Sequence, residues 1–175
     1  VHKSDAGCVR LDLRNVSDVR LAYREIMANA SILAKPEAIQ GVTVQSMIPG
    51  GFEVIVGGLY DLQAGPVIMF GLGGIWVDAV NDIAFRLAPV TREEAEAMIG
   101  EVKGASLLLK GGRGRRPVNR DVLLDLIVET SHLMAALSLA ELDLNPVILH
   151  DDLYTIADAR FLLQTASGKK GTPRG

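Results

Sequence analysis

Residues 141–150 read ELDLNPVILH, residues 151 and 152 are both Asp, and residues 153–160 read LYTIADAR. Two apolar runs of strand character flank an acidic break, a pattern that predicts a β-hairpin. Asp143 and Asn145 are two residues apart, so both side chains project from one face of a strand. The returning strand can bring Asp158 opposite them. This segment therefore predicts an antiparallel strand pair that gathers several oxygen atoms on one face.

The residue types in this group favour Mg²⁺ over Zn²⁺ as a bound ion. The group offers oxygen atoms and neither sulfur nor imidazole, and Mg²⁺ prefers oxygen ligands. Mg²⁺ usually takes only one or two carboxylates from the protein and fills its other positions with water and phosphate oxygens. The alternative is ordinary turn chemistry, because Asn-Pro and Asp-Asp pairs are common in turns. From the residues alone, both interpretations stay open.

Composition bounds the class of protein. The 175 residues have room for one domain or two small lobes, and 49% of them are hydrophobic, which is typical of a globular chain. The net charge of −3 predicts neither nucleic acid nor a membrane surface as a partner. The single cysteine, Cys8, excludes an internal disulfide and indicates a reducing cytoplasm. The longest uncharged stretch, residues 62–77, contains Pro66 and four glycines, so we expect no membrane-spanning helix.

Periodicity and capping signals predict an α+β chain. Ser17 is expected to cap a first helix, Thr91 with Glu94 forms a capping box for a second, and Asn119 caps a third that ends near Leu137. Strands are expected at residues 8–13, 41–48, 53–60, 66–70 and 81–87. Strands in adjacent hairpins with a few interspersed helices favour an antiparallel sheet over a doubly wound parallel one.

Three further motifs each have two interpretations. Gly71-Leu-Gly-Gly74 follows a buried strand, as a phosphate-binding loop would, but Trp76 replaces the third glycine of a dinucleotide fingerprint. A tight turn explains these glycines equally well. His2 opens a His-Lys-Ser-Asp run that holds a possible nucleophile or phosphate carrier, or that forms a frayed polar terminus. Glu53 begins an apolar strand and is either an edge charge or a polar contact to a ligand.

Taken together, four stretches resemble one known family. They are residues 2–7 (HKSDAG), 50–57 (GGFEVIVG), 65–75 (GPVIMFGLGGI), and 141–146 (ELDLNP) with 157–160 (ADAR). They are similar to the ATP-grasp subunit or domain of NDP-forming acyl-CoA synthetases, relatives of the succinyl-CoA synthetase β subunit. The resemblance implies a partial ATP-grasp fold over residues 1–165, with mostly antiparallel sheets, packed helices and a missing N-terminal part. Residues 166–175 are then a flexible tail or linker.

The resemblance also implies a reversible reaction, in which acyl-CoA, ADP and phosphate give the acid, CoA and ATP. An acyl phosphate and a phosphohistidine are the intermediates, and this domain passes the phosphoryl group to ADP with Mg²⁺. The implied cofactors are Mg²⁺ and ATP or ADP, with GDP an open alternative. The implied partner is a CoA-binding domain or α subunit that bears the phosphohistidine and handles the acyl-CoA, within a hetero- or homo-oligomer. The family's nucleotide-gripping lysine lies upstream of the His2 motif, so we expect this piece alone not to complete the reaction.

Individual roles follow from the same resemblance. His2 and Asp143 match catalytic positions, where Asp143 steadies the phosphohistidine and His2 takes part in phosphoryl transfer. Asn145 and Asp158 match the Mg²⁺ ligands. Positions that match nucleotide contacts are Gln45, Ser46, Met47, Glu53, Gly71, Gly73 and Gly74.

Two rival functions belong to other classes. A ligand-sensing regulatory module, fused to an acetyltransferase or another domain, has a related architecture, and loss of the metal ligands would favour it. Here Asn145 and Asp158 are present. A carboxylate–amine ligase of the wider ATP-grasp class is the third alternative, and the His2 motif argues against it.

Overall fold

The computed structural model describes residues 6–74, 82–111, 116–137 and 139–164. The chain divides into two compact units, Val1–Pro49 and Gly50–Gly175. The expected tail at residues 166–175 lies outside the described residues, and so does His2. In the part of the chain that is described, no helix is long and apolar enough to cross a membrane.

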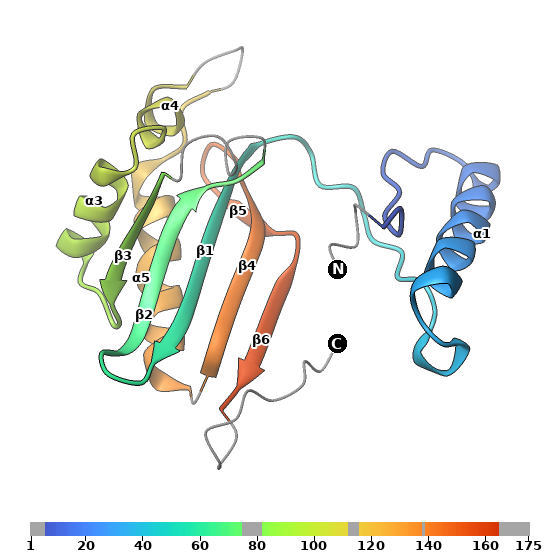
Figure 1. Cartoon of the computed structure of the whole chain (residues 1–175). Coiled ribbons are helices and arrows are strands. Elements are labelled where there is room, and N and C mark those ends of the chain that lie inside the picture. The colour runs from blue at the N-terminus through green and yellow to red at the C-terminus, as the bar shows by residue number, and fades with distance from the viewer. Residues whose placement is uncertain (1–5, 75–81, 112–115, 138, 165–175) are drawn as a thin grey trace. The chain divides into compact units, whose positions relative to one another are not determined.

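The second unit is built on a six-stranded antiparallel sheet with the order β3-β2-β1-β4-β5, in which β6 also pairs with β4 (Figure 1). The strands are β1 (Phe52–Asp61), β2 (Gly65–Leu72), β3 (Ile83–Leu87), β4 (Leu139–Leu149), β5 (Tyr154–Ile156) and β6 (Ala159–Leu163). The expected antiparallel α+β architecture is confirmed. The acidic break at Asp151 and Asp152 separates β4 from β5, as a hairpin requires.

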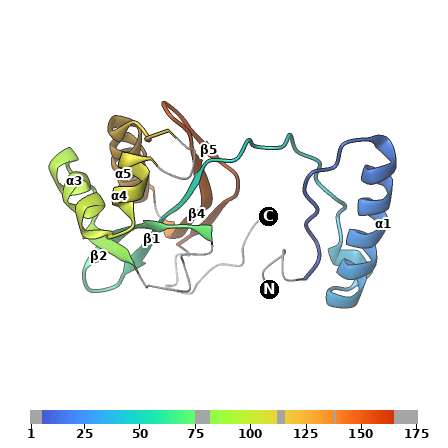
Figure 2. The same ribbon diagram turned by 90° about the horizontal axis from the view of Figure 1, so that it is seen from above.

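Three helices of this unit, α3 (Arg92–Glu101), α4 (Ala105–Lys110) and α5 (Arg120–Ala136), cover one face of the sheet (Figure 2). The Thr91–Glu94 capping box opens α3, and the Asn119 side chain accepts from the backbone of Asp121 at the start of α5. Both expected caps are confirmed. The sequence reading misses α4, because Gly104 precedes it and provides no side-chain cap.

The core of the second unit lies between this sheet and these helices. Val54, Val56, Ile68 and Phe70 alternate along β1 and β2 and are fully buried. They pack in one cluster with helix residues that include Met98, Leu123, Ile127 and Met134. Because side chains alternate along a strand, the residues between them point to the other face. We call that side, opposite α3, α4 and α5, the distal face; it carries Ile55, Gly57, Met69, Gly71 and Asp143.

The first unit contains α1 (Val16–Leu33) and the short 3₁₀ helix η1 (Pro36–Ala38). The N-cap of α1 is Asn15, which accepts a hydrogen bond from the Asp18 amide, so the expectation that Ser17 caps this helix is wrong by two residues. The strands expected at 8–13 and 41–48 are also wrong: neither segment pairs into a ladder, and Leu11 is 66% exposed. Apolar–polar alternation makes a strand only when a neighbouring strand accepts its hydrogen bonds.

Candidate functional site

The candidate site of the second unit begins on β4 and β6. Leu142 and Leu144 are buried in the core, so Asp143 and Asn145 alternate with them and point to the distal face. The backbone N–H of Asn145 donates to the backbone oxygen of Asp158 over 3.1 Å. The returning chain brings Asp158 next to Asn145, as expected, but Asp158 lies in the connection between β5 and β6 and not on a strand. The functions expected of these three residues stay predictions.

Asp143 sits in a negatively charged neighbourhood. Its direct partner on β6 is Arg160, and on the other side its partner on β1 is Gly57. Burial raises the pKa of the Asp143 carboxyl, the charges of Glu141 and Asp158 raise it further, and Arg160 lowers it. Holding the ionised form of Asp143 therefore costs free energy, which a cation arriving at this face would offset.

Asn145 and Asp158 are both exposed and offer oxygen donors. Among the described residues, no three His, Cys, Asp or Glu side chains gather as a metal-binding group. The two oxygen donors themselves suit Mg²⁺, which is commonly held by one or two protein oxygens with water and phosphate as further ligands. The donor set is thus compatible with the magnesium site that the sequence predicts.

Glu53 and the glycines of 71–74 lie at one end of the same sheet. The Gly73 amide donates to the backbone oxygen of Glu53 over 2.8 Å. A Cβ on Gly73 would lie 3.1 Å from Glu53, and a Cβ on Gly74 would lie 3.0 Å from Glu53 Oε2, with Gly74 at a φ of +67°. Gly71 pairs with Ile55, and a Cβ there would meet Ile83 at 2.7 Å. Close packing against Glu53 and Ile83 therefore requires these glycines, and contact with phosphate stays a prediction.

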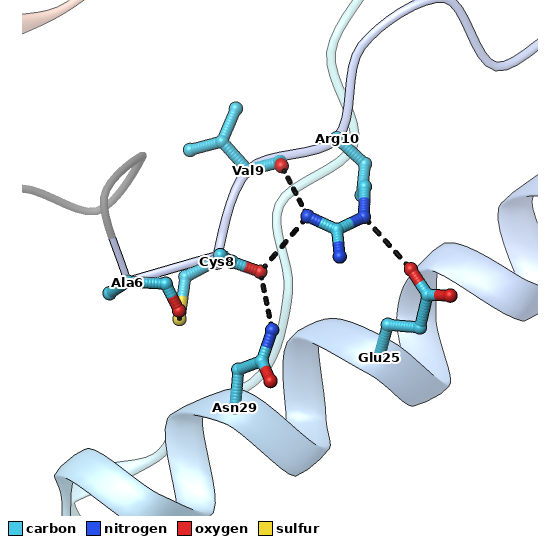
Figure 3. Close-up of polar contacts among 7 residues, drawn as sticks. Ala6, Cys8, Val9, Arg10, Glu25 and Asn29 are labelled. Carbon is cyan, nitrogen blue, oxygen red and sulfur yellow. Dashed lines mark hydrogen bonds and ion pairs between the residues drawn. The ribbon is translucent and has the colours of Figure 1, made fainter.

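The other expected nucleotide contacts, Gln45, Ser46 and Met47, belong to the first unit, where they lie in an extended, exposed segment. The segment that follows the His2 motif is held on α1 (Figure 3). The Asn29 side chain donates to the Gly7 carbonyl over 2.8 Å, and Arg10 Nε pairs with Glu25 over 2.9 Å. A Cβ on Gly7 would lie 2.6 Å from Asn29 Nδ2, so only glycine allows this close approach.

Sequence reasoning assigns no role to Gly57, Glu141 or Arg160, although the structure places all three beside Asp143. For two of them a signal was present. Glu141 precedes Asp143 by two residues and Arg160 follows Asp158 by two, which is the spacing that keeps strand side chains on one face. Gly57 could not be found this way, because it reaches Asp143 only through the pairing of β1 with β4.

Comparison with known proteins identifies the fold and the family. The family model for the ATP-grasp domain matches residues 1–163. The chain is 46% identical over 165 residues to the acetate–CoA ligase (ADP-forming) I subunit beta of Pyrococcus furiosus. The matched region covers 93% of this chain and 70% of that protein. It is 43% identical over 164 residues to the acetate–CoA ligase (ADP-forming) I of Archaeoglobus fulgidus. That match covers 93% of this chain and 24% of that protein.

Solved structures of the dinucleotide forming acetyl-coenzyme A synthetase 1 of Ca. Korarchaeum cryptofilum have the same fold. The complex with coenzyme A, Ca-AMPCP and HgCl⁺ matches with a TM-score of 0.86 at 43% identity, over 93% of this chain and 71% of that one. A second complex, with coenzyme A and Mg-AMPPCP and with its phosphohistidine segment pointing towards the nucleotide binding site, matches with a TM-score of 0.77 at 41% identity, over the same shares. The chain therefore belongs to the ATP-grasp family of ADP-forming acyl-CoA ligases, which are acid–thiol ligases.

Proposed function

We propose that this chain is the nucleotide-binding part of an ADP-forming acyl-CoA ligase and transfers a phosphoryl group between a phosphohistidine and ADP. The observation that carries the proposal is that Asp143 and Asn145 lie on β4 of an ATP-grasp sheet and Asp158 lies beside them, in the connection between β5 and β6. Phosphoryl transfer requires mainly positioning and charge neutralisation from the protein. This group supplies both a carboxylate that can orient an imidazole and two oxygen donors for a metal ion.

In the proposed site, Asn145 and Asp158 would hold Mg²⁺, which would supply neutralisation of the phosphate charge. Their exposure in the structure suits this function, because a metal with several non-protein ligands needs an accessible site. Glu53, Gly71, Gly73 and Gly74 are proposed to contact the nucleotide, and so are Gln45, Ser46 and Met47.

Asp143 is proposed to orient the phosphohistidine ring. One ring nitrogen carries the phosphoryl group, and the other donates a hydrogen bond to the Asp143 carboxylate. During transfer to ADP, the P–N bond breaks and its electron pair returns to the ring, while an ADP phosphate oxygen forms the new P–O bond. The proton on the second nitrogen stays in place, so the ring leaves as neutral imidazole. His2 is proposed to act in the same transfer.

The proposed partner is a CoA-binding α subunit or fused domain that carries the phosphohistidine. Both arrangements have support among the relatives, since the Pyrococcus furiosus protein is a β subunit and this chain spans only 24% of the Archaeoglobus fulgidus ligase. The acyl-CoA is proposed to react on that partner. A purely regulatory module is not favoured, because the relatives described above are named as ligases.

The proposal is tested on the full-length parent protein assembled with its partner. Asp158→Asn removes one proposed metal ligand, and we expect Mg·ADP affinity, measured by calorimetry, to fall at least about tenfold. The matched control is Asp152→Asn, which changes an exposed acid on the β4–β5 turn of the same hairpin. Equal Mg·ADP affinity in Asp158→Asn and in the control would contradict the assignment.

A further inference from the structure

One cation of the sheet remains without a function after these assignments. Among the strand residues that the structure describes, only Arg86 on β3 and Arg160 on β6 are positively charged. Arg86 makes a two-point ion pair with Glu101 of α3, so its side chain lies on the helix-covered face. Arg160 pairs directly with Asp143 and shares its face. Arg160 is therefore the one cation that the described strands place on the distal face.

The guanidinium of Arg160 is held only weakly where it lies. Arg160 forms an ion pair with Glu141, at 3.8 Å from Arg160 Nη1 to Glu141 Oε1, and its side chain is 54% exposed. An exposed, single-point pair of this length constrains a long side chain little. The guanidinium can therefore turn from Glu141 to another anion without leaving the distal face.

The charges around Asp143 indicate which kind of anion Arg160 would bind on the distal face. The charges of Glu141 and Asp158 act on Asp143, and Arg160, which pairs with Glu141, is the cation beside it. A phosphoryl group that reaches Asp143 meets a surplus of negative charge on the protein side. A guanidinium binds phosphate oxygens with two parallel hydrogen bonds and is always charged, so it is well suited to offset this repulsion. Directly paired residues of an antiparallel ladder have Cβ atoms about 4.5–5.5 Å apart, which puts Arg160 beside any group that contacts Asp143.

We propose that Arg160 contacts the phosphoryl group in transit and is a catalytic residue of this transfer, a role that rests on the proposed function. In the resting state its guanidinium pairs with Glu141. When the phosphohistidine meets ADP, the guanidinium donates to the phosphoryl oxygens while the P–N bond breaks and the P–O bond forms. Gly57 pairs with Asp143 from the other side, and the end of the Met69 side chain would lie 3.3 Å from a Cβ at Gly57.

The test compares Arg160→Gln, Arg160→Lys and Arg120→Gln in the full-length protein assembled with its phosphohistidine-bearing partner. Two quantities are measured: the single-turnover rate at which labelled ATP phosphorylates the partner's histidine, and the Mg·ADP affinity by calorimetry. We expect Arg160→Gln to lower the rate by about 10³- to 10⁵-fold, as for other arginines that stabilise a phosphoryl group in transfer. Arg160→Lys should regain part of this loss, because it keeps the charge without the two-point geometry.

Arg120→Gln is the matched control, since it removes an exposed arginine of the same unit that pairs with Glu96 between α5 and α3, on the helix side of the sheet. Its rate should stay within about threefold of wild type, because an exposed ion pair contributes little to structure. Equal losses in Arg160→Gln and Arg120→Gln would overturn the inference in favour of a general effect of losing an exposed ion pair. So would a wild-type rate in Arg160→Gln, or a loss of Mg·ADP affinity as large as the loss of rate. If the wild-type assembly neither binds Mg·ADP nor phosphorylates the histidine, the proposed function itself falls, and this inference with it.

Discussion

Two adjacent glycines of β1 lie on opposite faces of the sheet, and replacing each by alanine separates core packing from the candidate site. A Cβ on Gly58 would point toward the helices, 2.9 Å from the Val67 carbonyl oxygen and 3.1 Å from the Met134 side chain. A Cβ on Gly57 would point to the distal face, 3.3 Å from the Leu142 carbonyl oxygen and from the end of the Met69 side chain. The same chemical change therefore meets rigid backbone and core at one position, and looser contacts at the other.

The difference in stability follows from these contacts. Gly→Ala lowers the entropy of the unfolded chain and stabilises by about 0.4–1 kcal/mol at either position, so this contribution cancels between the two variants. Overpacking a filled core costs about 1–3 kcal/mol. This cost applies to Gly58→Ala, because the new Cβ would meet the backbone oxygen of Val67 and the buried side chain of Met134. At Gly57 the flexible end of Met69 can move aside. We therefore expect Gly58→Ala to be less stable than Gly57→Ala by about 1–3 kcal/mol.

Urea unfolding followed by far-UV circular dichroism measures this difference. Phosphoryl transfer in the assembled protein gives the complementary readout, and Gly57→Ala should slow it while Gly58→Ala should not, because only Gly57 flanks Asp143 on the distal face. Equal stabilities of the two variants would refute the packing argument. A transfer defect confined to Gly58→Ala would refute the assignment of the distal face as the functional face.

Two further predictions concern the charge of the site and the core. Asp143→Asn should stabilise the fold at neutral pH, because the native pKa of Asp143 is raised and its ionised form therefore opposes folding. The gain should vanish as the pH falls below the ordinary aspartate pKa, where wild type is protonated in both states, and a gain independent of pH in thermal melts from pH 3 to 8 would contradict this cause. Ser131→Ala should cost about 1–3 kcal/mol in chemical unfolding, because the Ser131 hydroxyl accepts from the Val90 amide and loss of that acceptor leaves a buried N–H unpaired. Thr130→Val removes a neighbouring hydroxyl that donates to the Leu126 carbonyl within the same helix, so it leaves no backbone N–H unpaired and should cost less. A larger loss of stability in Thr130→Val than in Ser131→Ala would count against this explanation.

Elements with short-range signals were predictable from the sequence. The capping box of Thr91 and Glu94 and the cap at Asn119 are hydrogen bonds within three residues, so the residue types alone predict them. At the first helix two capping residues compete, and Asn15 caps it in place of Ser17. The helix α4 gives no such signal, because a glycine precedes it.

Elements that depend on distant partners were not predictable in this way. Residues 8–13 and 41–48 have the alternation of strands but pair with nothing among the described residues, and remain extended segments. Alternation describes which side chains would share a face. It does not provide the neighbouring strand whose N–H and C=O groups must complete the ladder.

The candidate site combines both kinds of information. The sequence by itself determined that Asp143 and Asn145 share a face and that Asp158 returns beside them, because strand periodicity and a short hairpin are local properties. The sequence motifs also indicated the family, which the comparisons confirm. Only the tertiary structure decided that Gly57 and Arg160 flank Asp143, because the pairing of β4 with β1 and with β6 depends on burying one shared core beneath α3, α4 and α5.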